Sequence, residues 1–171
     1  MPPVPQDNRR TRDVAVVDRQ RSVRLAGRAV RSLAAFVLAR EHVGAPMGVN
    51  LVFVGARAMC RFNRDYTGRP HATDVLSFPA QPPLRAAPAD TLTIGDVIVS
   101  AECAAAYART HGLPVDEELA RYIVHGILHC LGYDDGNDST RVAMTARQEL
   151  LLRQWRAAYG GRVCRGAGRS T

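Results

Sequence analysis

The chain has 171 residues, a length at which one domain buries about two-thirds of its unfolded surface and two separate cores do not fit. It contains no apolar run of the ~20 residues that a membrane-spanning helix needs, and no signal-peptide apolar segment near Met1. We therefore expect a cytoplasmic single-domain protein with no membrane partner. The net charge of +7 favours a polyanionic partner. Every basic side chain is an arginine, which suits phosphate binding but also fits a genome-wide codon bias.

The first half of the chain predicts two strands and two helices after a polar leader. Residues 1–12 are rich in Pro and Arg, so we expect a disordered leader there. Apolar periodicity then predicts a strand over 13–17, a long amphipathic helix over 22–42, a strand over 50–54 and a short helix over 56–65. A loop over 67–74 follows.

The second half predicts two more strands and three helices. A strand over 75–78 ends at a proline, a Pro/Ala-rich surface loop covers 81–89, and a strand follows over 91–99. Helices are predicted from a cap at residue 100 to 111, over 116–131, and over 139–159. In the last helix we expect Val142, Leu150 and Trp155 to face inward, and after it a disordered tail over 160–171. Few strands and several helices indicate the α+β class.

Two histidines on the next-to-last predicted helix are the strongest functional signal. His125 and His129 stand four residues apart, so both imidazoles lie on one helix face and can bind the same ion. Gly132 then lets the backbone turn, so that a third ligand just beyond it, where two aspartates stand, can close the site. Three protein ligands leave one position open, which is typical of a catalytic zinc site.

The remainder of this helix supports a buried site. Apolar residues form two stripes around it and leave one polar strip, which consists of Glu118, Arg121, His125 and His129. This pattern predicts a cleft wall inside the molecule rather than a solvated surface. Cys130 falls on an apolar stripe, so we expect a packed core cysteine and not a ligand. The four cysteines have no CxxC spacing, which predicts reduced thiols.

The segment 125–134, His-Gly-Ile-Leu-His-Cys-Leu-Gly-Tyr-Asp, resembles the signature of the YbeY family, bacterial metal-dependent endoribonucleases linked to ribosomal RNA maturation. A second block, 63–79, fits the family's Asn-x-x-Tyr followed by Thr-Asp-Val-Leu-Ser-Phe-Pro. A third block, 95–100, is similar to the family's Gly-Asp strand. The blocks run in the family's order from about residue 51 to 154, so the resemblance covers most of the chain.

The resemblance implies a small mixed β-sheet packed by several helices, with a metal site at the C-terminal end of a central helix. The domain would cover residues 13–159. One Zn²⁺ per chain is implied as cofactor, and ribosomal RNA with the ribosome or its small subunit as partners. The implied activity is zinc-dependent endonucleolytic cleavage of single-stranded RNA, in ribosomal RNA maturation and ribosome quality control.

The ligand set departs from the family pattern. The motif normally ends in a third histidine, and that position is Asp135 here. A carboxylate is also a legitimate zinc ligand, so we predict His125, His129 and Asp135 as the metal ligands. Asp134 matches the family's own aspartate and is expected to hold the loop or a ligand in place. Residues expected to support the ligands or line the cleft are Thr73, Asp74 and Ser77.

The loop after the second predicted helix departs as well. The family carries an arginine directly after its tyrosine, where this chain has Thr67, and that arginine is thought to assist catalysis. Arg64 or Arg69 can supply a guanidinium from a neighbouring position, and we name Arg69 as the candidate catalytic residue. The alternative is that both are ordinary solvated arginines and that activity is reduced or altered.

Two other functions remain as alternatives. One is an RNA-binding or ribosome-assembly factor that holds zinc but has reduced catalysis, which the residues Thr67 and Asp135 motivate. The other is a zinc peptidase, because the ligand spacing matches that of metzincin proteases. Those proteases carry a glutamate base directly after the first histidine, and Gly126 occupies that position here. The sequence does not predict the oligomeric state or the RNA cleavage site.

Overall fold

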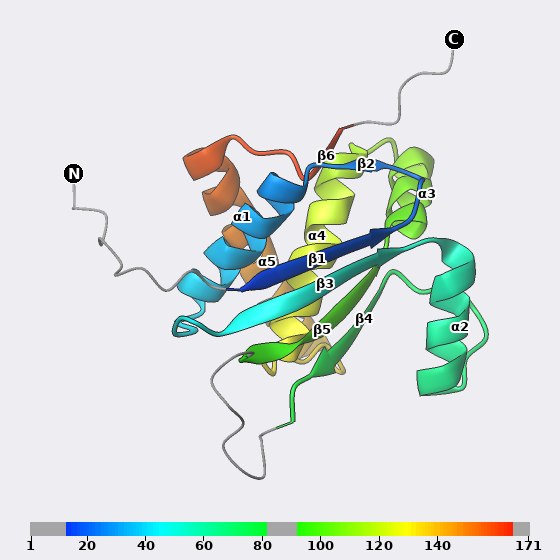
Figure 1. The fold of residues 1–171 in the computed structure, drawn as a ribbon, viewed down its shortest axis with the longest axis horizontal. Coiled ribbons are helices and arrows are strands. Elements are labelled where there is room, and N and C mark those ends of the chain that lie inside the picture. Colours follow the sequence, from blue (N-terminus) through cyan, green and yellow to red (C-terminus); the bar gives the residue numbers. More distant parts are fainter. Residues whose placement is uncertain (1–12, 82–91, 166–171) are drawn as a thin grey trace.

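A computed structural model describes residues 13–81 and 92–165, and its centre is a mixed four-stranded sheet (Figure 1). Along the sheet the strands are β1 (Val14–Arg19), β3 (Gly48–Val54), β5 (Thr93–Ser100) and β4 (Val75–Pro79). The first three are parallel, whereas β4 pairs antiparallel to β5 and forms one edge. Each strand places alternate side chains on opposite faces of the sheet.

Four helices lie on one side of the sheet (Figure 1). They are α1 (Gly27–Arg40), α3 (Ala101–His111), α4 (Val115–Cys130) and α5 (Asp138–Tyr159). Three of them contact its strands, and α5 packs on α1 and α4. Helix α4 is central, because it packs against β4, β5 and each of the other three helices. Apolar side chains of these helices and of the facing strand residues form the main core. No helix in the described ranges is both long and apolar enough to cross a membrane.

The opposite face of the sheet is covered differently. Helix α2 (Ala56–Thr67) lies against one end of it and encloses a small second core around Val54, Met59 and Ile98. The rest of this face has no helix over it in the described part of the chain (Figure 1). The sheet therefore has one fully packed face and one partly open face.

The α+β class and the single mixed sheet packed by helices are confirmed. Each strand and helix expected within the described ranges is present, with bounds shifted by a few residues. One expectation about packing is wrong: Val142 is 71% exposed, and Leu150 is only partly buried. The inward face of α5 instead consists of Met144, Gln148, Leu151, Leu152 and Trp155. The buried face of α5 is thus slightly rotated about the helix axis from the predicted one. Hydrophobic periodicity alone defines the buried face poorly near the start of a helix.

Two short strands close the C-terminal side of the domain. Strand β2 (Arg24–Leu25) lies where we expected the first turn of a helix, and it pairs with β6 (Cys164–Arg165). Asp116 Oδ1 accepts hydrogen bonds from the backbone N–H groups of Val163 and Cys164, at 2.6 and 3.2 Å. The ordered chain thus continues past Tyr159, where we had expected the tail to begin. The expected leader, residues 82–89 of the Pro/Ala-rich loop, and residues 166–171 lie outside the described residues.

Candidate metal centre

Three side chains converge at the C-terminal end of α4. The Nε2 atoms of His125 and His129 are 3.0 Å apart, and each lies 3.7 Å from Asp135 Oδ2. One ligand atom from each residue lies within 4.8 Å of the other two, so this group can hold a metal ion. Among the described residues it is the only group of three or more His, Cys, Asp or Glu side chains that can do so.

The hydrogen bonds on the far side of each imidazole decide which nitrogen is free. His129 Nδ1 lies 3.0 Å from the carbonyl oxygen of Tyr133, to which only an N–H can donate. His125 Nδ1 lies 3.2 Å from Gln148 Oε1. With both protons on Nδ1, the two Nε2 lone pairs face each other and the Asp135 carboxylate. Three acceptors that converge without a proton between them fit a cation, so the residues present suit a bound metal.

A polar network fixes the side chain of Gln148. Its Nε2 donates to Glu149 Oε1 at 3.1 Å, so its Oε1 is the atom that accepts from His125. Arg121 Nε also donates to Glu149 Oε1, at 2.9 Å, and Arg121 Nη1 donates to Glu118 Oε2 at 3.1 Å. The polar network therefore holds the His125 imidazole in one tautomer through Gln148, a residue that was not predicted from the sequence.

The loop that carries the third ligand is held from both sides. Gly132 has a φ of +91°, a conformation that favours glycine, and it turns the chain back after α4. Tyr133 Oη donates to Glu41 Oε2 at 2.8 Å, and Arg147 Nε donates to Glu41 Oε1 at 2.7 Å. The loop is thereby tied to α1 and α5. Asp134 lies outside the ligand group, and its Oδ1 accepts from the backbone N–H of Gly136 at 3.1 Å.

Burial favours the neutral form of the first ligand. Desolvation, followed by repulsion from His129, lowers the pKa of His125, while the Asp74 and Asp135 carboxylates oppose that shift. A neutral imidazole is the form that binds a metal. The lowered pKa thus biases His125 toward the form that can bind a metal.

Of the residues expected to support the site, Ser77 lies on β4, and Thr73 and Asp74 directly precede it. Ser77 Oγ donates to the Gly126 carbonyl of α4 at 3.0 Å, which ties the edge strand to the metal-bearing helix. Asp74 Oδ1 accepts from Thr73 Oγ1 at 3.0 Å and from the Val75 N–H at 2.9 Å. The Asp74 carboxylate acts electrostatically on His125 and raises its pKa, but Asp74 is not one of the three residues that can hold a metal.

The candidate arginines do not join the ligand group. Thr67, at the end of α2, donates through Oγ1 to the backbone and side-chain oxygens of Asn63, both at 2.7 Å. Arg64 pairs with Asp65 at 2.9 Å, at the surface. Arg69 is exposed, and within the described ranges its guanidinium has no hydrogen-bond or ion-pair partner. This leaves it free to contact a substrate, and its catalytic role stays a prediction.

Packing around Gly126 bears on the peptidase alternative. A Cβ at this position would lie 2.3 Å from Val97 Cγ1 and 2.9 Å from Val75 Cγ2, because α4 lies directly on the sheet. The glutamate base of a metzincin therefore has no room after His125. Cys130 is confirmed as a core residue: its thiol is buried, and burial raises its pKa to about 11.

The residues behind the three candidate ligands were not predicted from the sequence. Gln148 carried a usable signal, because it is a polar residue on the apolar face of α5, at helical spacing from Met144 and Leu152. Glu41 and Arg147 carried none, since they are 106 residues apart in the sequence.

The family model and the relatives that match this chain carry the same family name. The family model described as "Endoribonuclease YbeY" matches residues 13–156. Proteins named Endoribonuclease YbeY from Anaeromyxobacter sp. (strain Fw109-5) and Beutenbergia cavernae are each 38% identical, over 76% and 71% of this chain. These alignments span 65% and 83% of the relatives' own lengths. A solution structure from Thermotoga maritima has the same fold, with a TM-score of 0.57 at 19% identity over 93% of this chain and 99% of that one. The chain therefore belongs to the YbeY family.

Proposed function

We propose that this protein is a zinc-dependent endoribonuclease that cleaves single-stranded RNA in ribosomal RNA maturation and ribosome quality control. It holds one Zn²⁺ per chain, works in the cytoplasm, and meets ribosomal RNA on the ribosome or its small subunit. The observation that carries this proposal is the group His125, His129 and Asp135, whose bare Nε2 atoms and carboxylate converge on one point.

The donor set favours zinc among the common ions. Two imidazole nitrogens and one carboxylate oxygen are ligands that zinc accepts in catalytic sites, whereas magnesium and calcium prefer sites built from oxygen alone. Asp135 adds a negative charge, so bound water should be less acidified here than at a site of three histidines. We therefore expect an active enzyme whose cleavage rate reaches its maximum at a higher pH than that of an enzyme with three histidine ligands.

The chemistry divides between the ion and the chain's own residues. A zinc ion with an open position supplies Lewis acid chemistry toward a phosphodiester. Gln148 and the Tyr133 carbonyl hold the imidazoles in the tautomer that presents Nε2. Arg69 is free to orient a phosphate oxygen. RNA is the natural substrate, because its 2′-hydroxyl offers a second possible nucleophile.

The decisive experiment measures cleavage of structured ribosomal RNA by protein stripped of metal and then reloaded with zinc. Site-limited cleavage in single-stranded regions, restored by zinc and abolished in His125→Ala, is the expected result. Binding of the RNA without cleavage under all metal conditions would instead establish the RNA-binding or assembly factor. A casein digestion run in parallel tests the peptidase, for which we expect no activity.

A further inference from the structure

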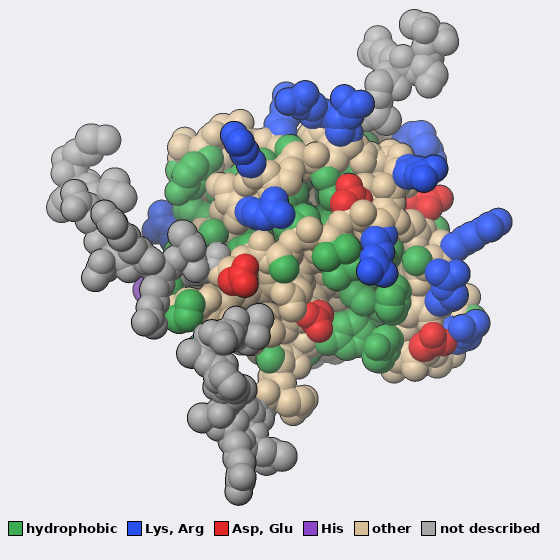
Figure 2. All heavy atoms as spheres, viewed as in Figure 1, with side chains coloured by type: hydrophobic (Ala, Val, Ile, Leu, Met, Phe, Trp, Pro, Cys, Tyr) green, Lys and Arg blue, Asp and Glu red, His purple; other side chains and the backbone are tan. Residues whose placement is uncertain are grey.

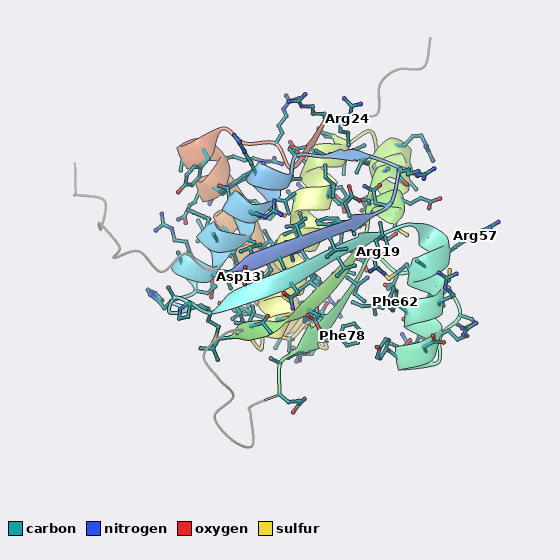
Figure 3. The ribbon with its side chains drawn as sticks, viewed as in Figure 1. Asp13, Arg19, Arg24, Arg57, Phe62 and Phe78 are labelled. Atoms are coloured by element: carbon teal, nitrogen blue, oxygen red, sulfur yellow. The ribbon has the colours of Figure 1, made fainter. Side chains whose placement is uncertain are left out.

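The partly open face of the sheet contains a hollow of about 610 Å³ between the strands and α2. We call it the sheet hollow. The lining residues that matter here are Arg19, Asn50, Phe62, Tyr66, Phe78 and Asp96. Figure 3 shows Phe62 of α2 and Phe78 of β4 close together, with Arg19 at the end of β1 above them. Figure 2 shows an apolar patch on this face with basic side chains on its rim.

The sheet hollow and the metal centre lie on opposite faces of one edge strand. Val75 and Ser77 of β4 face α4, whereas Leu76 and Phe78 face the hollow. Because β4 forms an edge of the sheet, one extended strand that passes along this edge can contact both faces. The two sites can therefore be contacted by different nucleotides of the same RNA.

The apolar part of the hollow is an aromatic platform. Tyr66 is 64% exposed, and its ring centroid lies 4.6 Å from that of Phe78. The Tyr66 ring is nearly parallel to that of Phe62, with centroids 6.5 Å apart. An exposed tyrosine supported by two further rings offers a flat surface of the kind on which nucleobases stack. Such stacking accepts any base.

The polar part of the hollow distinguishes between bases. Asn50 Nδ2 donates to Asp96 Oδ1 at 2.7 Å, so within the described ranges Asn50 Oδ1 and Asp96 Oδ2 remain as acceptors on two side chains that already contact each other. A ligand that satisfies both must present two adjacent donors. Among the four RNA bases only guanine does so, through N1–H and its exocyclic amine. In the described residues the Arg19 guanidinium has no hydrogen-bond or ion-pair partner, so it can meet a phosphate.

We propose that the sheet hollow binds a guanine base of single-stranded RNA, stacked on Tyr66, with its donor edge on Asn50 and Asp96 and its phosphate near Arg19. This proposal rests on the proposed function for the class of ligand, since RNA is taken from there. Each part of a guanine nucleotide has a counterpart in the hollow: the aromatic platform for the flat ring, the acceptor pair for the two donors, and the guanidinium for the phosphate.

The test measures binding of fluorescently labelled RNA pentamers by anisotropy, with chelator present so that no cleavage occurs. A single central guanine in an adenine background is compared with all-adenine and with inosine, which lacks only the exocyclic amine. We expect the guanine pentamer to bind about tenfold tighter than the all-adenine pentamer, with inosine between them. Asp96→Asn should remove that preference.

Two tyrosine variants provide the matched comparison. Tyr66→Ala should weaken binding of every pentamer by about tenfold, because the stacking surface is lost. Tyr159→Ala, which removes a tyrosine of similar exposure (62%) at the end of α5, should leave binding unchanged. Equal affinity for guanine and inosine pentamers, or equal effects of the two variants, would overturn the proposal. The proposal would also be overturned if Tyr66→Ala weakened the binding of an arginine-rich peptide but left RNA binding unchanged. The hollow would then be a binding site for protein.

This test is separate from that of the proposed function. Because it runs without metal, a guanine preference can be found in a protein that never cleaves RNA. Conversely, cleavage of ribosomal RNA with no guanine preference in the pentamers would sustain the nuclease and reject the hollow as a guanine site.

Discussion

The metal centre and the loop after α2 are built in opposite ways. At the metal centre each ligand or its loop is held by a further side chain or carbonyl: Gln148 for His125, and the Glu41 pair for the loop of Asp135. In the loop, Arg69 is exposed and its guanidinium has no partner within the described ranges. A metal ligand must stand in place before the ion arrives, whereas a residue that contacts a long substrate can be ordered by that substrate.

This contrast explains why the two departures from the family pattern differ in consequence. Asp135 replaces a histidine inside a fixed frame, so its effect depends on reach and charge. Thr67 replaces an arginine at the last residue of α2, and the loop that follows carries Arg69, whose exposed guanidinium can substitute. We therefore expect substitutions at the metal centre to have larger and more specific effects than those in the loop.

The largest effect is expected from loss of a histidine. His125→Ala or His129→Ala leaves two ligands, so zinc content should fall from about one per chain to near zero, and RNA cleavage should fall with it. Metal analysis of protein purified without chelator measures this. His111→Ala, an exposed histidine on α3, is the control and should keep its zinc. Full occupancy in both ligand variants would remove the basis for the metal site.

The next effect concerns the third ligand. Asp135→Ala should weaken zinc binding, whereas Asp135→His should keep or strengthen it, because an imidazole restores the family pattern and reaches further. Asp134→Ala removes a carboxylate that accepts from the Gly136 N–H and lies outside the ligand group, so this variant should retain zinc. Competition with a chelator measures the zinc affinity of the three variants. If Asp134→Ala releases the metal and Asp135→Ala does not, the ligand has been assigned to the wrong aspartate.

A smaller effect is expected behind the ligands. Gln148→Leu removes the acceptor for His125 Nδ1, so the imidazole can adopt the wrong tautomer, and zinc affinity should fall by about 10- to 100-fold. Gln148→Glu still offers an acceptor and should rescue the affinity. Gln154→Leu, on the same helix, is the matched control. Should Gln148→Leu bind zinc as tightly as Gln154→Leu, the network does not orient the ligand.

The smallest and least specific effect is expected in the loop. Arg69→Ala should lower RNA cleavage by roughly tenfold without changing zinc content, because a guanidinium stabilises charge on the phosphate as the transition state forms. If Arg69 has taken over this role, Thr67→Arg should add little. If the role has been lost, Thr67→Arg should raise cleavage. Rates unaffected by either change, with cleavage still abolished by chelation, would leave the loop without a catalytic part.

Local patterns in the sequence determined much of the framework. The spacing of His125 and His129 placed both imidazoles on one face of α4, and the alternation along β4 placed Val75 and Ser77 together on one face. Such patterns are reliable because helical and extended backbones repeat at fixed intervals between residues close in the chain. The resemblance of the motif blocks added the identity of the third ligand position.

Only the tertiary structure decided what stands behind the ligands and what lines the open face. Gln148 reaches His125 across 23 residues, Glu41 meets Arg147 across 106, and Asn50 meets Asp96 across 46. These contacts follow from the order of strands in the sheet and from the rotation at which α5 docks on α4. Both are set by the packing of whole apolar faces, a property of the assembled core that no window of sequence contains.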